Sequence, residues 1–530
     1  MKRWIIVVFL LIGVGGAIWA LWFRSSPRRV PTRTVTIPLE RDIQTLDPAK
    51  ESDPVNGHFA WQIYEGLAGL NAKNEVVPLL ADSWQSQDGG RKWVFKLRSR
   101  VEFHPFGQGP PRTVSANDVV YSYERIAKGF GSFVFQGVIE GFDAYITGQT
   151  TGISGIKATS PNEVTITLTK PDPSFIYRIS SPYLSVMSKE AAEADPDAFG
   201  RSIAIGTGPF RLVNATSTEI TLERNPRYWR TSTGNIERLI FRVEKNPQFR
   251  MSGLLAGKYD LLELPSEFRS QFIKSNELLP EYSQKYRIFA MPTFNVHHLS
   301  IDVRQIKDVS LRRAIYMAID REAITSRLLL GGAIPSRGSI PPGMQGFVSE
   351  LSTGYDPEAA KRELVKSSYK NEEFTILVSD TPNHADVAQI IQSDLLKCGI
   401  KTKIELVDFN TFVTRVLSAG RPPLFLAYGE WVYSAPEILM DAFRASATPN
   451  PNLTGFSNDR VEALLDRLRG ELPRAEINAI CNQIEKIVVE TPPEVWLYNV
   501  VHTYIARQPL SGFAVTGNDH WLLTDLRSEP

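Results

Sequence analysis

The chain has few of the residues from which metal and redox centres are built. Its 530 residues include two cysteines and seven histidines. Cys398 and Cys481 lie far apart in the sequence, and neither belongs to a CxxC pair or a cysteine–histidine group. No HExxH motif occurs either, so no metal site and no cofactor are expected. Two separately buried thiols are the simpler interpretation, and a disulfide between them stays open.

The motifs of nucleotide-binding and hydrolytic enzymes are also missing. The GTGP turn at 206–209 lacks the Lys-Ser/Thr pair of a phosphate-binding loop and precedes a predicted strand. No GxSxG motif occurs, and no carboxylate pair can be placed on one face of an element. An enzyme is therefore not expected. In a strand, the rings of His297 and His298 would point to opposite faces and could not share a metal. A structural role is expected for them, with nickel or haem binding as the alternative.

The charge balance argues against a nucleic-acid partner. Lys and Arg number 59 against 58 Asp and Glu, which gives a formal net charge of +1. No basic run with interleaved aromatic residues appears beyond the N-terminus. Hydrophobic residues make up 42% of the chain and charged residues 22%, as in ordinary globular proteins. A chain of this length predicts two or three lobes rather than one simple core.

One long apolar run stands at the N-terminus. It extends without a charge from Trp4 to Phe23, and a helix of that length spans about 30 Å, the thickness of a bilayer core. Trp19 and the bulky residues after it interrupt the small-residue pattern of a signal-peptide cleavage site. We therefore expect an uncleaved membrane anchor rather than a cleaved signal. The arginines of the 24–33 linker favour a cytoplasmic C-terminal side, although large domains translocate despite such charges.

Residues 61–125 combine turns, a strand and a helix in one unbroken segment. Asp88-Gly89-Gly90 predicts a tight turn, after which Trp93, Phe95 and Leu97 alternate with charged residues as in a half-buried strand. Ser115 and Asp118 have the spacing of a capping box, which predicts a helix that continues to Gly129. The segment carries almost no nucleophilic or paired acidic groups, so we expect it to have a structural rather than a catalytic role.

The rest of the chain divides into two patterns. Strands are predicted at 163–169, 219–224 and 238–243, so the region from about 160 to 245 is rich in β-structure. After residue 310, strands and helices alternate, beginning with apolar residues at helical spacing from 311 to a stop at Gly331-Gly332. Asp356 before Pro357 predicts the start of a further helix. This alternation predicts an α/β lobe with a largely parallel sheet.

Several short segments together resemble the bacterial extracellular solute-binding proteins of family 5, the peptide-, nickel- and opine-binding components of ABC importers. They occur in the family's order. The segments are LDPA (46–49), YEGL (64–67), PLLADSW (78–84), WVFKLRSRVEFH (93–104), SANDVVYSYERI (115–126), GTGPFRLV (206–213), LERNPRYW (222–229), LLAGKYDLLEL (254–264) and LRRAIYMAIDREAI (311–324).

The resemblance implies an α/β fold like that of periplasmic binding proteins, with two α/β lobes around a cleft and an extra domain on the first lobe. The implied boundaries are 1–23 for the anchor, 24–33 for the linker, 34–70 with 200–290 and 495–530 for lobe I, 71–199 for the extra domain and 291–494 for lobe II. The hinge is then expected near 285–295 and 490–497, where Pro292 and Pro492-Pro493 lie.

The resemblance also implies where a ligand lies. In peptide-binding members of the family, an extended peptide pairs with two backbone segments, which match 50–54 and 428–434 here. The candidate cleft residues are Glu51, Ser52, Asp53, Glu430, Trp431, Tyr433 and Ser434. Peptide-binding relatives carry an acid three residues after the tryptophan, and that acid pairs with the peptide's ammonium. Ser434 stands there instead and cannot neutralise a buried charge, so Glu430 or Asp53 would have to substitute.

The expected function follows from the same resemblance. It is a membrane-anchored, extracytoplasmic and monomeric binding protein that delivers a peptide or peptide-like solute to the permease subunits of an ABC importer. Oligosaccharides, opines and metal chelates stay open as other ligands, since Trp431 and Tyr433 could stack on a sugar or ring, or simply belong to the core. A solute sensor on the same fold and an enzyme or chaperone-like protein are the remaining alternatives.

Overall fold

A computed structural model describes residues 33–50, 54–274, 277–348, 351, 354–418, 420–430, 433–448 and 451–529. The expected anchor at 1–23 and all but the last residue of the linker lie outside these ranges. Within them, no helix has the length and the apolar composition needed to span a bilayer.

A four-stranded sheet near the C-terminus, called sheet A, contains the first strand that the structure describes. Its strands are β1 (Thr34–Leu39), β8 (Phe210–Ala215), β9 (Glu219–Arg224) and β10 (Arg238–Val243). They lie in the order β1-β10-β9-β8, and β1 is parallel to β10 while the other pairs are antiparallel. The strands predicted at 219–224 and 238–243 are confirmed by β9 and β10.

A second four-stranded sheet, called sheet B, contains β4 (Ala81–Gln87), β5 (Lys92–Leu97), β6 (Ile156–Ser160) and β7 (Glu163–Thr167). Trp93, Phe95 and Leu97 of β5 are all buried, as their alternation predicts. The turn before β5 has φ of +65° at Gly89 and +90° at Gly90, values that suit glycine. The capping box of Ser115 and Asp118 is confirmed and begins α3 (Ala116–Ile126).

The largest sheet, called sheet C, has the order β11-β19-β14-β18-β16-β17, with β15 paired to β19. It is mixed rather than largely parallel, because only β16, β17 and β18 run parallel to one another. Helices α13 and α14 make the crossovers between these three strands. The elements are β11 (Leu261–Glu263), β14 (Tyr286–Ile301), β15 (Ala333–Pro335), β16 (Glu373–Ser379), α13 (His384–Lys397), β17 (Lys401–Val407), α14 (Phe409–Leu417), β18 (Leu424–Glu430) and β19 (Glu494–Arg507).

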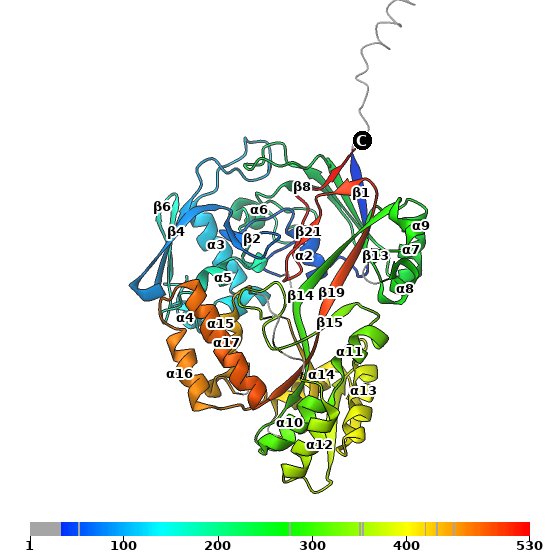
Figure 1. Ribbon diagram of the computed structural model, residues 1–530. Helices are drawn as coiled ribbons and strands as arrows, with labels where there is room; N and C mark the ends of the chain where they lie inside the picture. The colour runs from blue at the N-terminus through cyan, green and yellow to red at the C-terminus, as the bar shows by residue number, and fades with distance from the viewer. Residues whose placement is uncertain are drawn as a thin grey trace, which may run out of the picture.

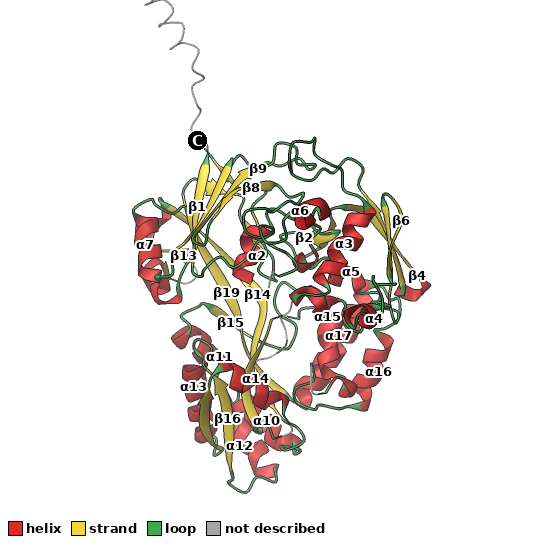
Figure 2. Cartoon of the chain, turned by 180° about the vertical axis from the view of Figure 1, so that it is seen from behind, coloured by secondary structure: helices red, strands yellow, loops and turns green. Residues whose placement is uncertain are grey.

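Two long strands connect the ends of the molecule. In Figures 1 and 2, β14 and β19 run side by side from the region of sheet A to the helices around β16. Their antiparallel pairing shifts register between Pro292 and Val296, where the ladder is interrupted. At that break the backbone N–H of Phe294 donates to the carbonyl of Gly517 at 2.7 Å, so the C-terminal segment takes the place of a strand partner.

The helix predicted from residue 311 to Gly331 is wrong in its length. It is interrupted after Ala318, where α10 (Val309–Ala318) ends, and helical structure resumes as α11 (Arg321–Ala323) and a π-helical turn at Ile324–Leu328. Asp320 causes the break, because its side chain accepts a hydrogen bond from the backbone N–H of Ala323 and caps a new turn. The cap predicted at Asp356 is confirmed by its bond from Ala359 and begins α12 (Pro357–Lys366).

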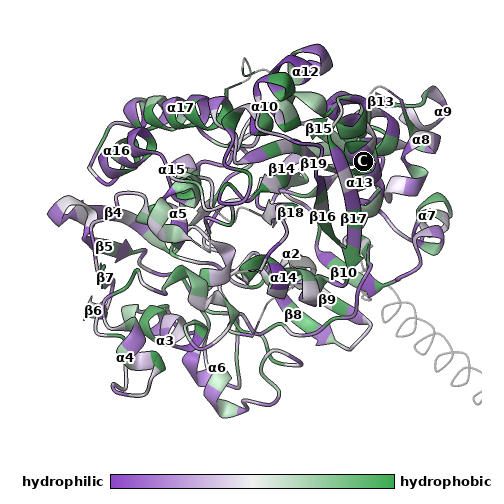
Figure 3. Cartoon of the chain, turned by 90° about the horizontal axis from the view of Figure 1, so that it is seen from below, coloured by the Kyte–Doolittle hydropathy of each residue, from purple (hydrophilic) through white to green (hydrophobic). Residues whose placement is uncertain are grey.

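Helices α15 (Pro436–Met440), α16 (Asp459–Arg467) and α17 (Arg474–Glu490) lie beside the part of the chain that contains sheet B (Figures 1 and 2). Figure 3 shows hydrophobic and hydrophilic residues alternating along α16 and α17, as in helices that cover a core. Cys481 is buried in α17 and Cys398 is buried after α13, and both are free thiols. The remaining elements used below are α2 (Pro54–Ala60), β2 (Ala68–Leu70), β3 (Val76–Pro78), α5 (Phe175–Ile179), α7 (Pro247–Leu255) and β21 (Ala514–Val515).

Candidate functional site

The structure describes only some of the cleft residues expected from the sequence. Glu51, Ser52, Asp53 and Trp431 lie outside the described ranges. Glu430 ends β18, where its backbone is opposite Asn295 of β14. Tyr433 and Ser434 are described in full, and they lie just before α15.

Tyr433 and Ser434 present buried hydroxyl groups without protein partners. Ser434 is 1% exposed, and among the described residues neither its hydroxyl nor that of Tyr433 has a hydrogen-bond partner. The guanidinium of Arg178 lies 5.2 Å above the Tyr433 ring, which is the geometry of a cation–π contact. Burial raises the pKa of Tyr433, so its hydroxyl stays protonated. The acid expected three residues after the tryptophan is thus replaced by the buried hydroxyl of Ser434.

An aromatic cluster connects Tyr433 to residues that are far away in the sequence. We define it as Trp61, Phe130, Phe133, Tyr183 and Tyr433. The ring centroids of Trp61 and Tyr183 are 5.7 Å apart. Those of Tyr183 and Phe133 are 5.8 Å apart, and those of Phe133 and Tyr433 are 6.5 Å apart. Phe130 is 49% exposed and lies 5.6 Å from Tyr183. Rings at these separations form a continuous aromatic cluster, mostly buried, that connects one part of the fold to another.

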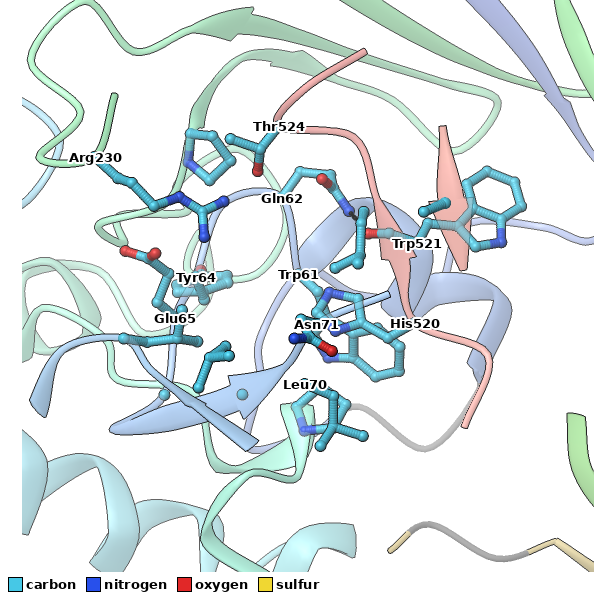
Figure 4. A pocket seen from close by; sticks show the side chains of 18 of the residues that line it. Trp61, Gln62, Tyr64, Glu65, Leu70, Asn71, Arg230, His520, Trp521 and Thr524 are labelled. Atoms are coloured by element: carbon cyan, nitrogen blue, oxygen red, sulfur yellow. Dashed lines mark hydrogen bonds between the residues drawn. The ribbon is translucent and has the colours of Figure 1, made fainter. Parts of the chain in front are cut away.

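A cavity of about 260 Å³ adjoins the cluster at Trp61. Its walls include the segment 61–72, which follows α2 and contains β2, and the C-terminal segment 512–525, with further residues from 77–79, 180–185 and 209–230. Figure 4 shows Trp61, Asn71 and His520 close together at one end, with Arg230 and Glu65 at the other. Trp61 therefore belongs both to the aromatic cluster and to the cavity wall.

Glu65 is a buried carboxylate that the protein itself satisfies. Its oxygens accept hydrogen bonds from the hydroxyls of Tyr228 at 2.7 Å and Thr207 at 2.9 Å, and from the indole N–H of Trp229 at 2.9 Å. Burial raises its pKa, and these three bonds oppose that rise. Because its acceptor positions are engaged, Glu65 holds three segments together.

His520 is neutral at the cavity wall. Burial lowers the pKa of His520 to about 4. Its ring meets the edge of Trp61, with centroids 5.0 Å apart. A neutral imidazole in this place adds to the aromatic lining without adding charge.

A second group of rings lies where β16 and β18 end in sheet C. His297 Nδ1 is 2.9 Å from His384 Nε2, and the His297 ring stacks on Tyr498 and Tyr428 at 4.4 and 5.3 Å. Burial lowers the pKa of His384 to about 4 and that of His297 well below its usual value. His298 has a different neighbour, since its Nε2 is 3.7 Å from Glu494. Across the residues that the structure describes, no group of three or more His, Cys, Asp or Glu is arranged to hold a metal.

The sequence predicted Tyr433 and Ser434 as candidate cleft residues, whereas Trp61, Tyr183 and His520, which the structure places in the aromatic cluster or at the cavity, were not among its candidates. Trp61 stands three residues before the YEGL segment, so its helical spacing to Tyr64 was the one available signal. His520 comes from the other end of the chain, and nothing in its local sequence indicates that it meets Trp61.

Comparison with known proteins agrees with this architecture. Residues 75–450 match the sequence model of the bacterial extracellular solute-binding proteins, family 5. The chain is 26% identical to the heme-binding protein A of Haemophilus influenzae over 467 residues, which cover 85% of this chain and 83% of that protein. It is 26% identical to the dipeptide-binding protein of Escherichia coli over 432 residues, 73% of this chain and 78% of that protein.

Among solved structures, the unliganded open form of the periplasmic murein tripeptide binding protein MppA superimposes with a TM-score of 0.82. The match covers 94% of this chain and 97% of that chain, at 22% sequence identity. The fold is therefore that of periplasmic binding proteins, with two α/β lobes and an extra domain, as the sequence predicted. The family match extends over more than half of the residues. This chain belongs to the bacterial extracellular solute-binding proteins of family 5.

Proposed function

We propose that the protein captures a peptide or peptide-like solute between its two lobes and delivers it to the permease of an ABC importer. The aromatic cluster is the observation that carries this proposal. It brings Tyr433, which follows a strand of sheet C, against Phe133, and it continues through Tyr183 to Trp61 at the cavity. A solute that touches both ends of the cluster stabilises the closed arrangement of the lobes.

A peptide suits the groups on this surface. The two unpartnered hydroxyls of Tyr433 and Ser434 can bond to main-chain amides, and the flat rings can pack on side chains. The names of the dipeptide-binding relative and of the murein tripeptide binding protein favour the same ligand class. Haem, opines, oligosaccharides and metal chelates belong in the test panel because a haem-binding relative is equally similar in sequence.

We place lobe I at 34–70 with 200–290 and 495–530, the extra domain at 71–199 and lobe II at 291–494. Sheet A lies within the first set of residues and sheet B within the second. Strands β14 and β19 pass through the boundaries near 290 and 495, which supports a hinge made of these two strands. The 1–23 segment is proposed as an anchor that holds a monomer on the outer side of the membrane, with both lobes facing the permease.

Ligand titration tests the proposal. Purified protein without the 1–23 segment is mixed with di- and tripeptides, haem, an opine, a sugar and a metal chelate, and tryptophan fluorescence and Tm are recorded. Peptides are expected to raise Tm and to change the fluorescence of Trp61. Replacing Trp61 by Phe should remove most of the fluorescence change, whereas Trp84→Phe in sheet B should not. A panel without any shift contradicts the proposal.

The acid missing at Ser434 makes a second comparison informative. A peptide and its N-acetylated form are expected to bind with similar affinity if no carboxylate neutralises the ammonium. A loss of more than tenfold on acetylation would assign that role to Glu430 or Asp53. For the location, a C-terminal alkaline phosphatase fusion is expected to be active in cells, and an inactive fusion would favour the cytoplasmic sensor.

A further inference from the structure

The molecule contains two large hydrophobic cores, and the division between them crosses β14 and β19. In β14, Phe289 and Met291 pack against the core that contains residues of sheets A and B, whereas Phe294 belongs to the core around β16 and β18. In β19 the same change occurs between Val500 and Tyr504. We call the part with the first core the first body and the part with the second core the second body. Two bodies that pack separately and are joined by a pair of strands can rotate about those strands.

Helix α5 of the first body contacts the second body to one side of these strands. Phe175 and Ile179 fix α5 in the first core, and Tyr177 between them is buried. Arg474, the first residue of α17, donates from Nη2 to the Tyr177 hydroxyl at 2.7 Å, and its guanidinium lies 4.8 Å from the Tyr177 ring. Figures 1 and 2 both show α5 beside α15 and α17, to one side of β14 and β19. Bending at the strands therefore separates α5 from α17.

Arg474 is held in place from within the second body. The helix dipole disfavours a cation at the first residue of a helix, and Glu437 of α15 compensates by accepting a hydrogen bond from Arg474 Nη1 at 2.8 Å. The Glu437 side chain is buried, and Leu439 and Ile477 fix α15 and α17 in the second core. Arg474 is thus a positioned donor whose second partner, Tyr177, belongs to the other body.

This contact lies outside the cavity but close to the aromatic cluster. Among the described residues that line the cavity beside Trp61, neither Tyr177 nor the Arg474–Glu437 pair is found. The next residue of α5, Arg178, is the one whose guanidinium lies over the Tyr433 ring. The same short helix therefore joins the first body to α17 and to the segment before α15.

We propose that Tyr177, Arg474 and Glu437 form a latch that holds the two bodies together and sets the solute affinity without touching the solute. The inference rests on the proposed function and adds to it the regulation of the same site. The latch is complete only when α5 and α17 meet, so it raises the fraction of molecules in the arrangement that binds. The apparent affinity is the intrinsic affinity multiplied by that fraction. Every solute that needs both bodies gains by the same factor, whatever its chemistry.

The spacing of the two bodies is measured first, in the solute-free full chain in detergent with both native cysteines replaced by Ala. Spin labels on Lys157→Cys of β6 and Arg460→Cys of α16, both at exposed positions, report the distance between the bodies by double electron–electron resonance. Tyr177→Phe keeps the ring and removes the hydroxyl that accepts from Arg474, and Arg474→Gln removes the charge. Each variant is expected to show a longer distance than the labelled chain without it.

The matched control removes an ion pair within one body. Arg467 Nη2 lies 3.0 Å from Glu476 Oε1 and joins α16 to α17 in the second body. Arg467→Gln therefore removes a guanidinium–carboxylate contact of the same kind without affecting the contact between the bodies. Its distance distribution and its solute affinity should equal those of the unmodified chain.

Calorimetry then measures the affinity for two chemically different tripeptides, Ala-Ala-Ala and Glu-Phe-Lys. Tyr177→Phe and Arg474→Gln are each expected to weaken both tripeptides by about tenfold, the worth of one hydrogen bond to a charged group. The factor should be the same for the two tripeptides. The double variant should bind no more weakly than Arg474→Gln alone, because both substitutions remove one shared contact.

The failures of the latch and of the proposed function are distinguishable. If neither tripeptide binds to the unmodified chain, the proposed function as a peptide receptor is wrong, while a longer distance in the variants still supports the latch. If tripeptides bind but both variants keep the distance and the affinity of the unmodified chain, the latch alone is wrong. A loss for only one tripeptide would mean that these residues touch the solute, which also overturns the latch. If Arg474→Gln does not fold, as judged by Tm, Tyr177→Phe alone decides.

Discussion

The region around Glu65 and the region around Tyr433 and Ser434 both contain buried polar groups, but among the described residues only the first provides hydrogen-bond partners for them. Around Glu65, three donors from Thr207, Tyr228 and Trp229 satisfy the carboxylate. At 433–434, two buried hydroxyls have no partner in the described part of the chain. An unmet buried polar group costs free energy, so it persists where something else supplies the bond. The first region is satisfied by the protein itself, and the second has the free hydroxyl groups that the proposed solute site would use.

Removing the Glu65 carboxylate should have the largest effect on stability. Glu65→Ala leaves one buried and two half-buried donors unpaired, and we expect the free energy of unfolding to fall by about 3–5 kcal/mol. Urea denaturation followed by circular dichroism measures it. Glu75→Ala, on the exposed β2–β3 turn, should cost far less. If Glu65→Ala lowered the free energy of unfolding by less than about 1 kcal/mol, the hydrogen bonds to Glu65 would not distinguish this region from the one around Tyr433 and Ser434.

Acid should weaken the protein through its buried neutral imidazoles. His384 has a folded pKa of about 4 against an ordinary value of 6.5, so its contribution is complete above pH 6.5 and is lost as the pH falls to about 4. The difference corresponds to about 3 kcal/mol. The loss of stability between pH 7.5 and 4 should therefore be smaller by about that amount in His384→Gln than in the unmodified protein. An unchanged pH slope in urea titrations would contradict this assignment.

Removing one of two buried hydroxyl groups, one with a partner and one without, should change stability by a moderate and different amount. Thr207→Val removes a hydroxyl that donates to Glu65, and Ser434→Ala removes one without a partner. We expect the first to cost about 1–2 kcal/mol in unfolding free energy and the second less than about 0.5 kcal/mol. Solute affinity should respond in the opposite order, with Ser434→Ala the weaker binder. Equal stability losses in both variants would show that Ser434 is bonded within the protein.

Tyr433→Phe should have the smallest effect on the fold. The variant keeps the ring under the Arg178 guanidinium and beside Phe133, and it removes only a hydroxyl without a protein partner. Its Tm is expected to equal or slightly exceed that of the unmodified protein. Peptide affinity, measured by calorimetry, should fall by about tenfold, the worth of one hydrogen bond. A clear drop in Tm would instead place Tyr433 in the core.

The sequence predicted the fold far better than it predicted the site. Local signals such as the alternation in β5, the Ser115 capping box and the Asp356 cap are complete within a few residues, and the structure confirms them. The helix predicted from residue 311 was too long because the Asp320 side chain caps a new turn. The spacing of apolar residues carries no information about such a cap. The parallel character of sheet C was overestimated because strand order depends on contacts between distant segments.

The site was harder to predict because its members meet only through the tertiary fold. Trp61 and His520 are in edge contact although they come from opposite ends of the chain. Likewise, His384, the first residue of α13, contacts His297 of β14, although the two are 87 residues apart in the sequence. Tyr433 and Ser434 could be named in advance because they lie within a segment that the family uses for ligands. No local pattern marks the partners that complete the cavity.

The C-terminal segment links the break in the β14–β19 ladder to the turn between β2 and β3 and to the cavity wall. Gly517 accepts the backbone N–H of Phe294 where the ladder of β14 and β19 is interrupted, and its own N–H donates to Asn74 Oδ1 at 2.6 Å. The Asn74 amide in turn donates to the carbonyl of Gly343 at 3.2 Å. Three residues after Gly517, His520 forms part of the cavity wall. The cavity wall at His520 and the segment that fills the break in the β14–β19 ladder thus belong to one continuous stretch of backbone.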